Sequence, residues 1–178
     1  ATGMAYVMHR NSRVSEYEKV LTAEHIKSLF SNEKKTIAKA SKGLVFITAN
    51  GNEVPVPQSK TPEFIGYQAV QQIIDDAMWR RASTVNFTPQ GEQYLVHYVI
   101  DGISTRQEDR DRESMEYTTR YLKHLADLDV NEKRKPQRGI FAIRKDNQKT
   151  EWELTTSGST AGEQLRLRAV KEYDLIKL

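Results

Sequence analysis

Residues 84–102, TVNFTPQGEQYLVHYVIDG, predict the kind of fold that this chain adopts. Residues 84–88 and 94–100 are rich in β-branched and aromatic side chains, which favour strands. Pro, Gln and Gly at positions 89–91 separate the two runs, a composition typical of a turn. Two strand-like runs joined by a short turn predict an antiparallel β-hairpin, and Asp101 with Gly102 predicts a second turn directly after it.

The segments on both sides of this hairpin predict two helices and three further strands. Residues 62–81 carry apolar side chains at three- and four-residue spacings, and residues 115–128 repeat that spacing. The mixed-charge stretch 106–113 is expected to be a solvated loop or the start of the second helix. The strand candidates are residues 140–144, 150–155 and 164–170. This order predicts an α+β domain, with a mainly antiparallel sheet and helices packed on one face.

The first sixty residues are expected to form a small segment of their own. Residues 12–41 show helical spacing with an interruption near Ser31, which predicts two short helices, and the second ends in a Lys-rich tail. Residues 44–48, followed by Val54 and Val56, predict two strands joined at an Asn-Gly turn. Residues 58–62 are typical of a linker. We therefore expect a helical and hairpin segment of unknown role over 1–60, and the α+β domain over 61–178.

The composition excludes several classes of protein. The 178 residues are 38% hydrophobic and 29% charged, which is typical of a globular chain with a charged surface. We find no apolar run of membrane-spanning length and no signal-peptide pattern, so we expect a cytoplasmic protein without direct membrane insertion. There are no cysteines, and the four histidines lack the spacing of a helical metal site. The net charge of +3 is too small to argue for nucleic acid.

The sequence lacks the elements that hydrolyse a nucleotide. It has no G-x-x-x-x-G-K-[ST] motif to cradle phosphates, so we expect these 178 residues to be inactive as an ATPase by themselves. The carboxylates of residues 108–113 alternate with arginines, which is typical of an ion-paired surface. Residues 157–159, Ser-Gly-Ser, lack the flanking residues of a nucleophile elbow. No catalytic residue is assigned.

One basic cluster has a functional character. It is compatible with a solvated loop beside a strand, a phosphate contact made in trans, a salt bridge to a neighbouring subunit, or a nucleic-acid contact. The residues alone do not decide among these. Its members are Lys133, Arg134, Lys135, Arg138, Arg144 and Lys145.

Residues 122–139, LKHLADLDVNEKRKPQRG, resemble a segment of the ATPases of type II secretion and type IV pilus assembly. In that family a helix ending in Leu-Asp-Ile/Val leads through Glu-x-Arg to Pro-Gln-Asp-Gly. Two further landmarks follow the family's order, one after the predicted hairpin and one before the last predicted strand. The resemblance covers residues 62–178 and is to the domain that precedes the motor. The matching residues are Asp101, Gly102, Glu132, Arg134, Pro136, Gln137, Gly139, Gly162 and Glu163.

The resemblance implies the N-terminal, pre-motor part of a hexameric ATPase. ATP and Mg would then be bound by the motor of the parent protein, with no cofactor in this chain. The implied partners are the motor domain, neighbouring subunits, and platform or adaptor proteins at the cytoplasmic face of the bacterial inner membrane. Two other functions stay open: a stand-alone, non-catalytic adaptor of the same fold, and a small basic nucleic-acid-binding domain, against which the modest net charge argues.

The chain departs from the family pattern at three positions, two of which hold arginines that lie near the nucleotide phosphates of the motor in the family. The Asp of Pro-Gln-Asp-Gly is replaced by Arg138, and the two family arginines are replaced by Ile140 and Glu153. Arg134, Arg138 and Arg144 are therefore the candidates for a nucleotide or interface contact, since a guanidinium offers a fixed fork to phosphate oxygens. Pro136 and a tight turn at Gly139 are expected to orient the loop that carries them.

Overall fold

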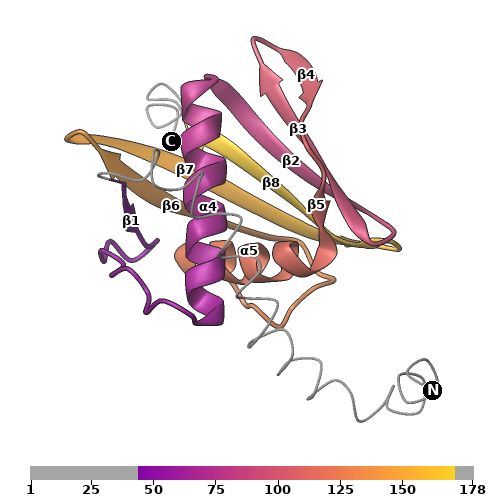
Figure 1. The fold of residues 1–178 in the computed structure, drawn as a ribbon, viewed down its shortest axis with the longest axis horizontal. Helices are drawn as coiled ribbons and strands as arrows, with labels where there is room; N and C mark the ends of the chain where they lie inside the picture. Colours follow the sequence, from indigo (N-terminus) through magenta and orange to yellow (C-terminus); the bar gives the residue numbers. More distant parts are fainter. Residues whose placement is uncertain (1–43, 171–178) are drawn as a thin grey trace.

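The computed structural model describes residues 44–170, which form an α+β domain (Figure 1). The described strands make one antiparallel sheet in the order β1-β6-β7-β8-β2-β3-β4, with β5 paired to β3 off that path. Helices α4 and α5 lie against one face of the sheet, so the predicted fold class is confirmed. The elements are β1 (Val45–Ile47), α4 (Pro62–Trp79), β2 (Ala82–Gln90), β3 (Gln93–Ile100), β4 (Ile103–Arg106), β5 (Arg110–Asp111), α5 (Arg112–Leu125), β6 (Gln137–Lys145), β7 (Gln148–Ser159) and β8 (Gly162–Val170).

The hairpin predicted from residues 84–100 is present and lies inside the sheet. β2 and β3 pair from Ala82 opposite Ile100 to Gln90 opposite Gln93. Gly91, in the turn between them, has a φ of 59°, a conformation that glycine adopts without strain. The other edge of β2 pairs with β8, so the hairpin joins the N-terminal and C-terminal halves of the domain.

The stretch after the hairpin contains two strands that the sequence did not predict. Asp101 and Gly102 form the expected turn, with φ of 51° and 77°, and β4 then folds back along β3. All four residues of β4 are exposed, so no alternation of apolar and polar residues marks it. Within the mixed-charge stretch, Arg110 of β5 pairs with Tyr94 of β3, and Arg112 begins α5. The expected solvated loop is therefore partly strand and partly helix.

Both predicted helices are present, and each begins at a capping residue. Thr61 accepts a hydrogen bond from the Phe64 amide at 3.3 Å, and Asp111 accepts one from the Ser114 amide at 2.9 Å. α5 ends at Leu125, three residues before the predicted end at position 128. The chain turns there because Asp127 adopts the left-handed conformation, with a φ of 56°.

The two helices approach each other closely at Gly66 of α4. A Cβ atom at this position would lie 2.6 Å from the carbonyl oxygen of Tyr117 in α5. Any other residue would force the helix backbones apart. Gly66 therefore sets the depth at which α4 and α5 pack over the sheet.

The short strand β1 belongs to the same sheet and the same core. It pairs with β6, with Val45 opposite Arg144. The Phe46 side chain is only 1% exposed, and its ring centroid lies 5.7 Å from that of Tyr67 in α4 and 5.9 Å from that of Tyr121 in α5. The domain boundary at residue 60 stays a prediction, but three residues that precede it form a strand of the sheet.

The strand predicted at Val54 and Val56 is wrong. In this part of the chain the structure has only an isolated bridge between Ile47 and Glu53, followed by a hydrogen bond from the Val54 amide to the Phe46 carbonyl at 2.9 Å. Pro55 and Pro57 lack the N–H groups that a continued ladder needs. The helices predicted within residues 12–41 lie outside the described residues.

We predict that Phe46→Ala lowers the free energy of unfolding by about 3–5 kcal/mol, the usual loss when a buried aromatic ring is truncated. Urea denaturation of the full chain measures it. Ile103→Ala is the matched control, because Ile103 is 69% exposed and its truncation should cost within about 0.5 kcal/mol. Equal effects of the two substitutions would show that β1 does not contribute to the core.

Candidate functional site

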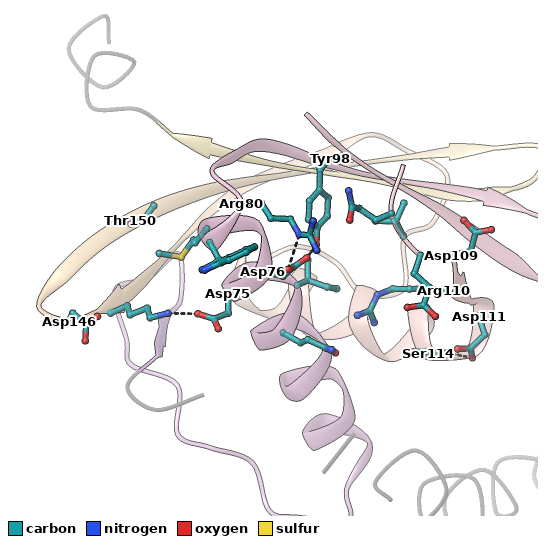
Figure 2. A pocket seen from close by; sticks show the side chains of 18 of the residues that line it. Asp75, Asp76, Arg80, Tyr98, Asp109, Arg110, Asp111, Ser114, Asp146 and Thr150 are labelled. Atoms are coloured by element: carbon teal, nitrogen blue, oxygen red, sulfur yellow. Dashed lines mark hydrogen bonds and ion pairs between the residues drawn. The ribbon is translucent and has the colours of Figure 1, made fainter. Parts of the chain in front are cut away.

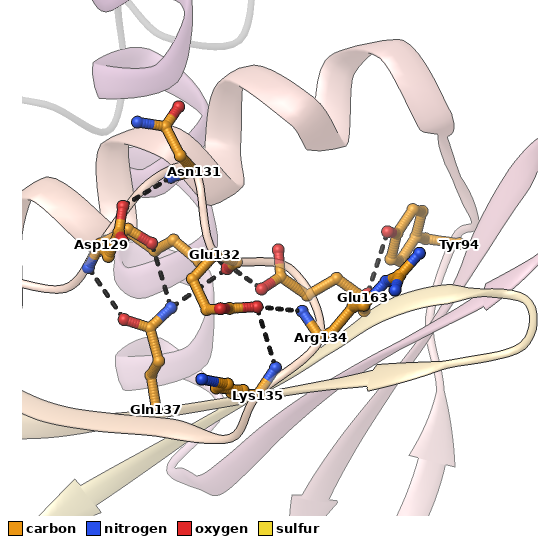
Figure 3. A network of polar contacts seen from close by, with 9 residues as sticks. Tyr94, Asp129, Asn131, Glu132, Arg134, Lys135, Gln137 and Glu163 are labelled. Carbon is orange, nitrogen blue, oxygen red and sulfur yellow. Dashed lines mark hydrogen bonds and ion pairs between the residues drawn. The ribbon is translucent and has the colours of Figure 1, made fainter.

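The loop between α5 and β6 is held to the sheet by a buried lysine. Lys123 of α5 is 1% exposed, and its Nζ lies 2.6 Å from Oε2 of Glu163 in β8. The same Nζ donates a hydrogen bond to the carbonyl oxygen of Glu132 at 2.6 Å (Figure 3). The Tyr94 hydroxyl donates to the Glu163 carbonyl at 3.0 Å. One cation therefore joins helix, loop and sheet.

The side chains of Gln137 and Glu132 fix the course of the loop itself. Gln137 accepts a hydrogen bond from the Asp129 amide at 2.8 Å and donates to the carbonyls of Asp129 and Glu132 at 3.0 and 3.1 Å (Figure 3). Glu132 accepts from the amides of Lys135 and Arg134 at 3.0 and 2.8 Å. These two backbone hydrogen bonds lower the pKa of Glu132 below its ordinary value.

Gly139 has a different role from the one predicted. It lies within β6 and is not among the glycines with a positive φ, so the expected tight turn is wrong. A Cβ atom on Gly139 would lie 2.4 Å from the Ala126 carbonyl oxygen, so the loop passes directly over this strand. Gly158 of β7 serves the same purpose, because its Cβ would meet Arg134 Cα at 2.7 Å and its amide donates to the Arg134 carbonyl at 3.1 Å.

The three candidate arginines do not form one site. Arg144, near the C-terminal end of β6, pairs with Glu53 at 2.5 Å. Arg138, near the other end of β6, donates through Nε to Glu153 at 2.7 Å. Arg134 lies in the loop, at a separate hollow. The basic cluster seen in the sequence is thus divided by the sheet, because residues six apart on an extended strand are separated by about 20 Å.

The hollow beside Arg134 has a volume of about 620 Å³ and lies between α5, the loop and the turn after β7. We call it the basic hollow. Within residues 44–170, Lys133, Arg134 and Arg120 form no ion pair. The Glu163 charge is balanced by Lys123. An excess of positive charge therefore remains. The charged residues that line the hollow are Arg112, Glu116, Arg120, Lys133, Arg134 and Glu163.

The second charged region is the face of the sheet opposite the helices. Phe141, Trp152, Leu154 and Leu167 are buried in the core, and the residues that alternate with them point away from it. Glu153 lies on this face between two guanidiniums, with Arg138 Nη2 at 2.5 Å and Arg168 Nε at 3.4 Å. We call this group the Glu153 triad.

The Glu153 triad explains two of the departures from the family pattern. Arg138 stands where the family has an aspartate, and Glu153 stands where it has an arginine. The structure brings these two residues into one ion pair, so the exchange of acidic and basic residues is reciprocal. Ile140, at the other lost arginine position, is opposite Glu153 in the β6–β7 register. The two family arginines are therefore replaced by an apolar residue and by a carboxylate that is already paired with Arg138.

The electrostatics of the Glu153 triad favour its ionised form. Partial burial alone would raise the pKa of Glu153, but hydrogen bonds and charge from Arg168 and Arg138 outweigh it, and the pKa lies below its ordinary value of 4.5. A carboxyl with a depressed folded-state pKa adds stability above its unfolded pKa, and this stability is lost as the pH falls.

The remaining landmarks lie at turns. Asp101 and Gly102 join β3 to β4, far along the chain from the loop network. Gly162 has a φ of 139° at the start of β8, immediately before the buried Glu163. Sequence reasoning missed Lys123 because it stands next to Leu122 in the helical pattern without any partner in sequence. The only signal was a lysine adjacent to the apolar stripe of a helix.

The described residues provide neither a metal-binding cluster nor a bilayer-crossing helix. No group of three or more His, Asp or Glu side chains within residues 44–170 is placed to hold a metal ion. Neither α4 nor α5 combines the length and apolar character of a bilayer-crossing helix, and no other described helix does.

We predict that Lys123→Met lowers the free energy of unfolding by about 3–5 kcal/mol, because it leaves Glu163 buried without its counter-charge. Adding Glu163→Leu should recover at least half of that loss, because the uncompensated carboxylate is then gone. Urea denaturation of the single and double variants measures the coupling. Additive effects of the two substitutions would contradict it. Arg80→Ala, which breaks an exposed pair with Asp76, should change stability by less than about 1 kcal/mol.

We also predict a pH dependence for the Glu153 triad. Between pH 6 and pH 3 the wild-type chain should lose more free energy of unfolding than Glu153→Gln. As the pH falls, the unfolded wild-type chain binds a proton at this carboxyl before the folded chain does, which favours unfolding, whereas the glutamine has no proton to bind. Urea titrations of both chains at the two pH values provide the comparison. If the losses were parallel, the triad would not stabilise the ionised carboxylate.

Comparison with known proteins agrees with this geometry. The family described as "Type II/IV secretion system protein" matches residues 60–176. A curated relative, competence protein ComGA of Bacillus subtilis (strain 168), is 22% identical over 105 residues, which are 59% of this chain and 30% of the relative. The chain thus matches less than a third of that relative's length. Because the family match covers well over half of the chain, this chain belongs to the type II/IV secretion system protein family.

Proposed function

We propose that this domain positions the motor in a hexameric ATPase of type IV pilus assembly or type II secretion. Membership in the family and the order of the landmarks support it. The observation that carries the proposal is the anchored loop, which presents Lys133 and Arg134 at the basic hollow while its backbone is fixed by Lys123, Glu132 and Gln137. A fixed backbone suits a residue pair that must meet a partner surface in one orientation.

The partner in this proposal is an acidic or phosphate-bearing surface of a motor domain, in the same or a neighbouring subunit. The basic hollow offers guanidinium and ammonium groups from α5 and from the loop. Charge-assisted hydrogen bonds to such groups strengthen where the interface excludes water. The domain would then move as a rigid body with the motor when nucleotide binds, because the loop, α5 and the sheet are linked through one buried ion pair.

The setting of the parent protein is part of the same proposal. ATP and Mg would bind in the motor, and the contribution of this domain would be mechanical. The assembly would act at the cytoplasmic face of the inner membrane, together with platform or adaptor proteins. Nucleic acid and direct membrane insertion are not part of it.

A second candidate function is a stand-alone adaptor of the same fold. The Glu153 triad favours it, because the two positions that carry arginines near the phosphates in the family hold an isoleucine and a glutamate here, and that glutamate is already paired with Arg138. A domain that has lost those contacts can still bind a protein partner through the basic hollow. The two functions differ in whether this hollow influences ATP turnover.

The test uses the full-length protein that carries this domain together with a motor. We predict that Lys133→Ala with Arg134→Ala lowers assembly-dependent ATP turnover at least several-fold, because the contact to the motor is lost. Thermal melting should be nearly unchanged, since both side chains are exposed. Lys149→Ala with Arg166→Ala is the matched control, since it also removes one exposed lysine and one exposed arginine, from β7 and β8, and neither residue lines the basic hollow.

Equal turnover in the two double variants would reject the motor contact and leave the adaptor function. A collapsed melting temperature of the Lys133 and Arg134 variant would instead assign these residues a structural role. Size-exclusion chromatography with light scattering, run on the same samples, separates loss of assembly from loss of turnover within an intact assembly.

A further inference from the structure

A second hollow, unrelated to the basic one, opens on the helix side of the sheet (Figure 2). Its volume is about 990 Å³, and it extends from the C-terminal end of α4 to β5 and the start of α5, and on to the β6–β7 turn. We call it the acidic hollow. It includes none of the residues that line the basic hollow.

The charges around the acidic hollow are unbalanced. Its lining holds six carboxylates and three basic side chains, an excess of three negative charges. The carboxylates are those of Asp75, Asp76, Glu108, Asp109, Asp111 and Asp146, and the basic side chains are those of Arg80, Arg110 and Lys145. Lys145 pairs with Asp75 and Arg80 pairs with Asp76, so these cations are already engaged (Figure 2). Glu108 and Asp146 form no ion pair with any residue in the described range 44–170, and both are exposed. Solvated carboxylates without a counter-charge attract cationic side chains.

An exposed aromatic ring stands at the same hollow. Trp79, the last residue of α4, is 81% exposed, whereas the other tryptophan, Trp152, is 1% exposed in the core. The Arg80 guanidinium lies 6.0 Å from the Trp79 ring centroid, so one face of the indole already attracts a cation. An indole beside free carboxylates fits the stem and head group of a lysine, because the stem packs on the ring while the ammonium meets a carboxylate.

The chain itself supplies a segment of complementary charge. Residues 33–43, EKKTIAKASKG, contain four lysines and one glutamate, a net charge of +3 that equals the deficit of the acidic hollow. This segment leads directly into Leu44 and β1. Val45 pairs with Arg144, which places Leu44 beside Lys145, and Lys145 lines the hollow. Ten extended residues reach about 33 Å, so lysines in this stretch can enter the hollow from its Lys145 end.

We propose that the acidic hollow is the docking site for the lysine-rich segment 33–43 of the same chain, whose lysines pair with Glu108 and Asp146 and pack on the Trp79 ring. The proposal is independent of the motor contact. Docking would cover the exposed indole and bring residues that precede β1 to the helix side of the sheet. It would also fix the position at which the N-terminal part of the chain leaves the domain.

The experiment uses the full chain. Because this chain has no cysteine, only the two introduced cysteines can form a disulfide within it. The test pair is Thr36→Cys with Gln107→Cys. Thr36 stands among the lysines of the segment in the sequence, and Gln107 lines the acidic hollow. Under mild oxidation at low protein concentration, this pair should form an intrachain disulfide at least five times faster than the control pair, Thr36→Cys with Gln164→Cys. Gln164 is exposed on β8 and does not line the hollow.

Charge provides the second arm of the experiment. Adding Glu108→Gln and Asp146→Asn to the first pair should slow its disulfide formation several-fold, and 1 M salt should do the same, because screening weakens exposed ion pairs. Equal rates for the two cysteine pairs would overturn the proposal. The proposal would also be overturned if the first pair formed its disulfide fast and neither the charge substitutions nor salt changed that rate, or if the disulfide joined two chains.

Discussion

The ion pair between Lys123 and Glu163 is the interaction on which the arrangement of the domain depends. It is buried on both sides, and its lysine also holds the Glu132 carbonyl, so the helix α5, the loop before β6 and the strand β8 share one cation. A buried pair of this kind adds little net free energy compared with an apolar pair, but breaking it leaves an uncompensated charge in the core. It therefore restrains where the loop can lie more than it strengthens the fold.

Glycine then determines how closely the elements approach the anchored loop. Gly139 and Gly158 let the loop backbone pass within contact distance of β6 and β7, and Gly66 does the same for the two helices. Once the loop is fixed in this way, Arg134 is held at the basic hollow while Arg138 belongs to the sheet face behind it. Two arginines only four residues apart thus serve different surfaces, one open to a partner and one already paired.

The distribution of charge gives the domain three distinct surfaces. Among residues 44–170, the basic hollow carries unpaired cations, the sheet face carries the Glu153 triad of one carboxylate between two guanidiniums, and the acidic hollow carries unpaired carboxylates next to an exposed tryptophan. A net charge of +3 for the whole chain hides this separation, because the opposite charges gather in two hollows that share no lining residue. A protein built in this way can bind partners of opposite sign at once. The proposed motor contact uses the basic hollow, and the proposed docking of residues 33–43 uses the acidic hollow.

The sequence by itself determined the helices, the hairpin and the three C-terminal strands, because each carries a local signal: a periodic apolar stripe, a Pro-Gly turn, or β-branched runs. It also placed Glu132, Gln137 and Glu163 among the family landmarks. Only the tertiary structure decided that β4 and β5 are strands, since neither carries an alternation of buried and exposed residues that would mark it in the sequence. Only it paired Arg138 with Glu153 and Lys123 with Glu163, and it assigned Gly139 to a close crossing and not to a turn. Contacts between residues fifteen to forty positions apart depend on strand register and helix packing, which no local pattern encodes.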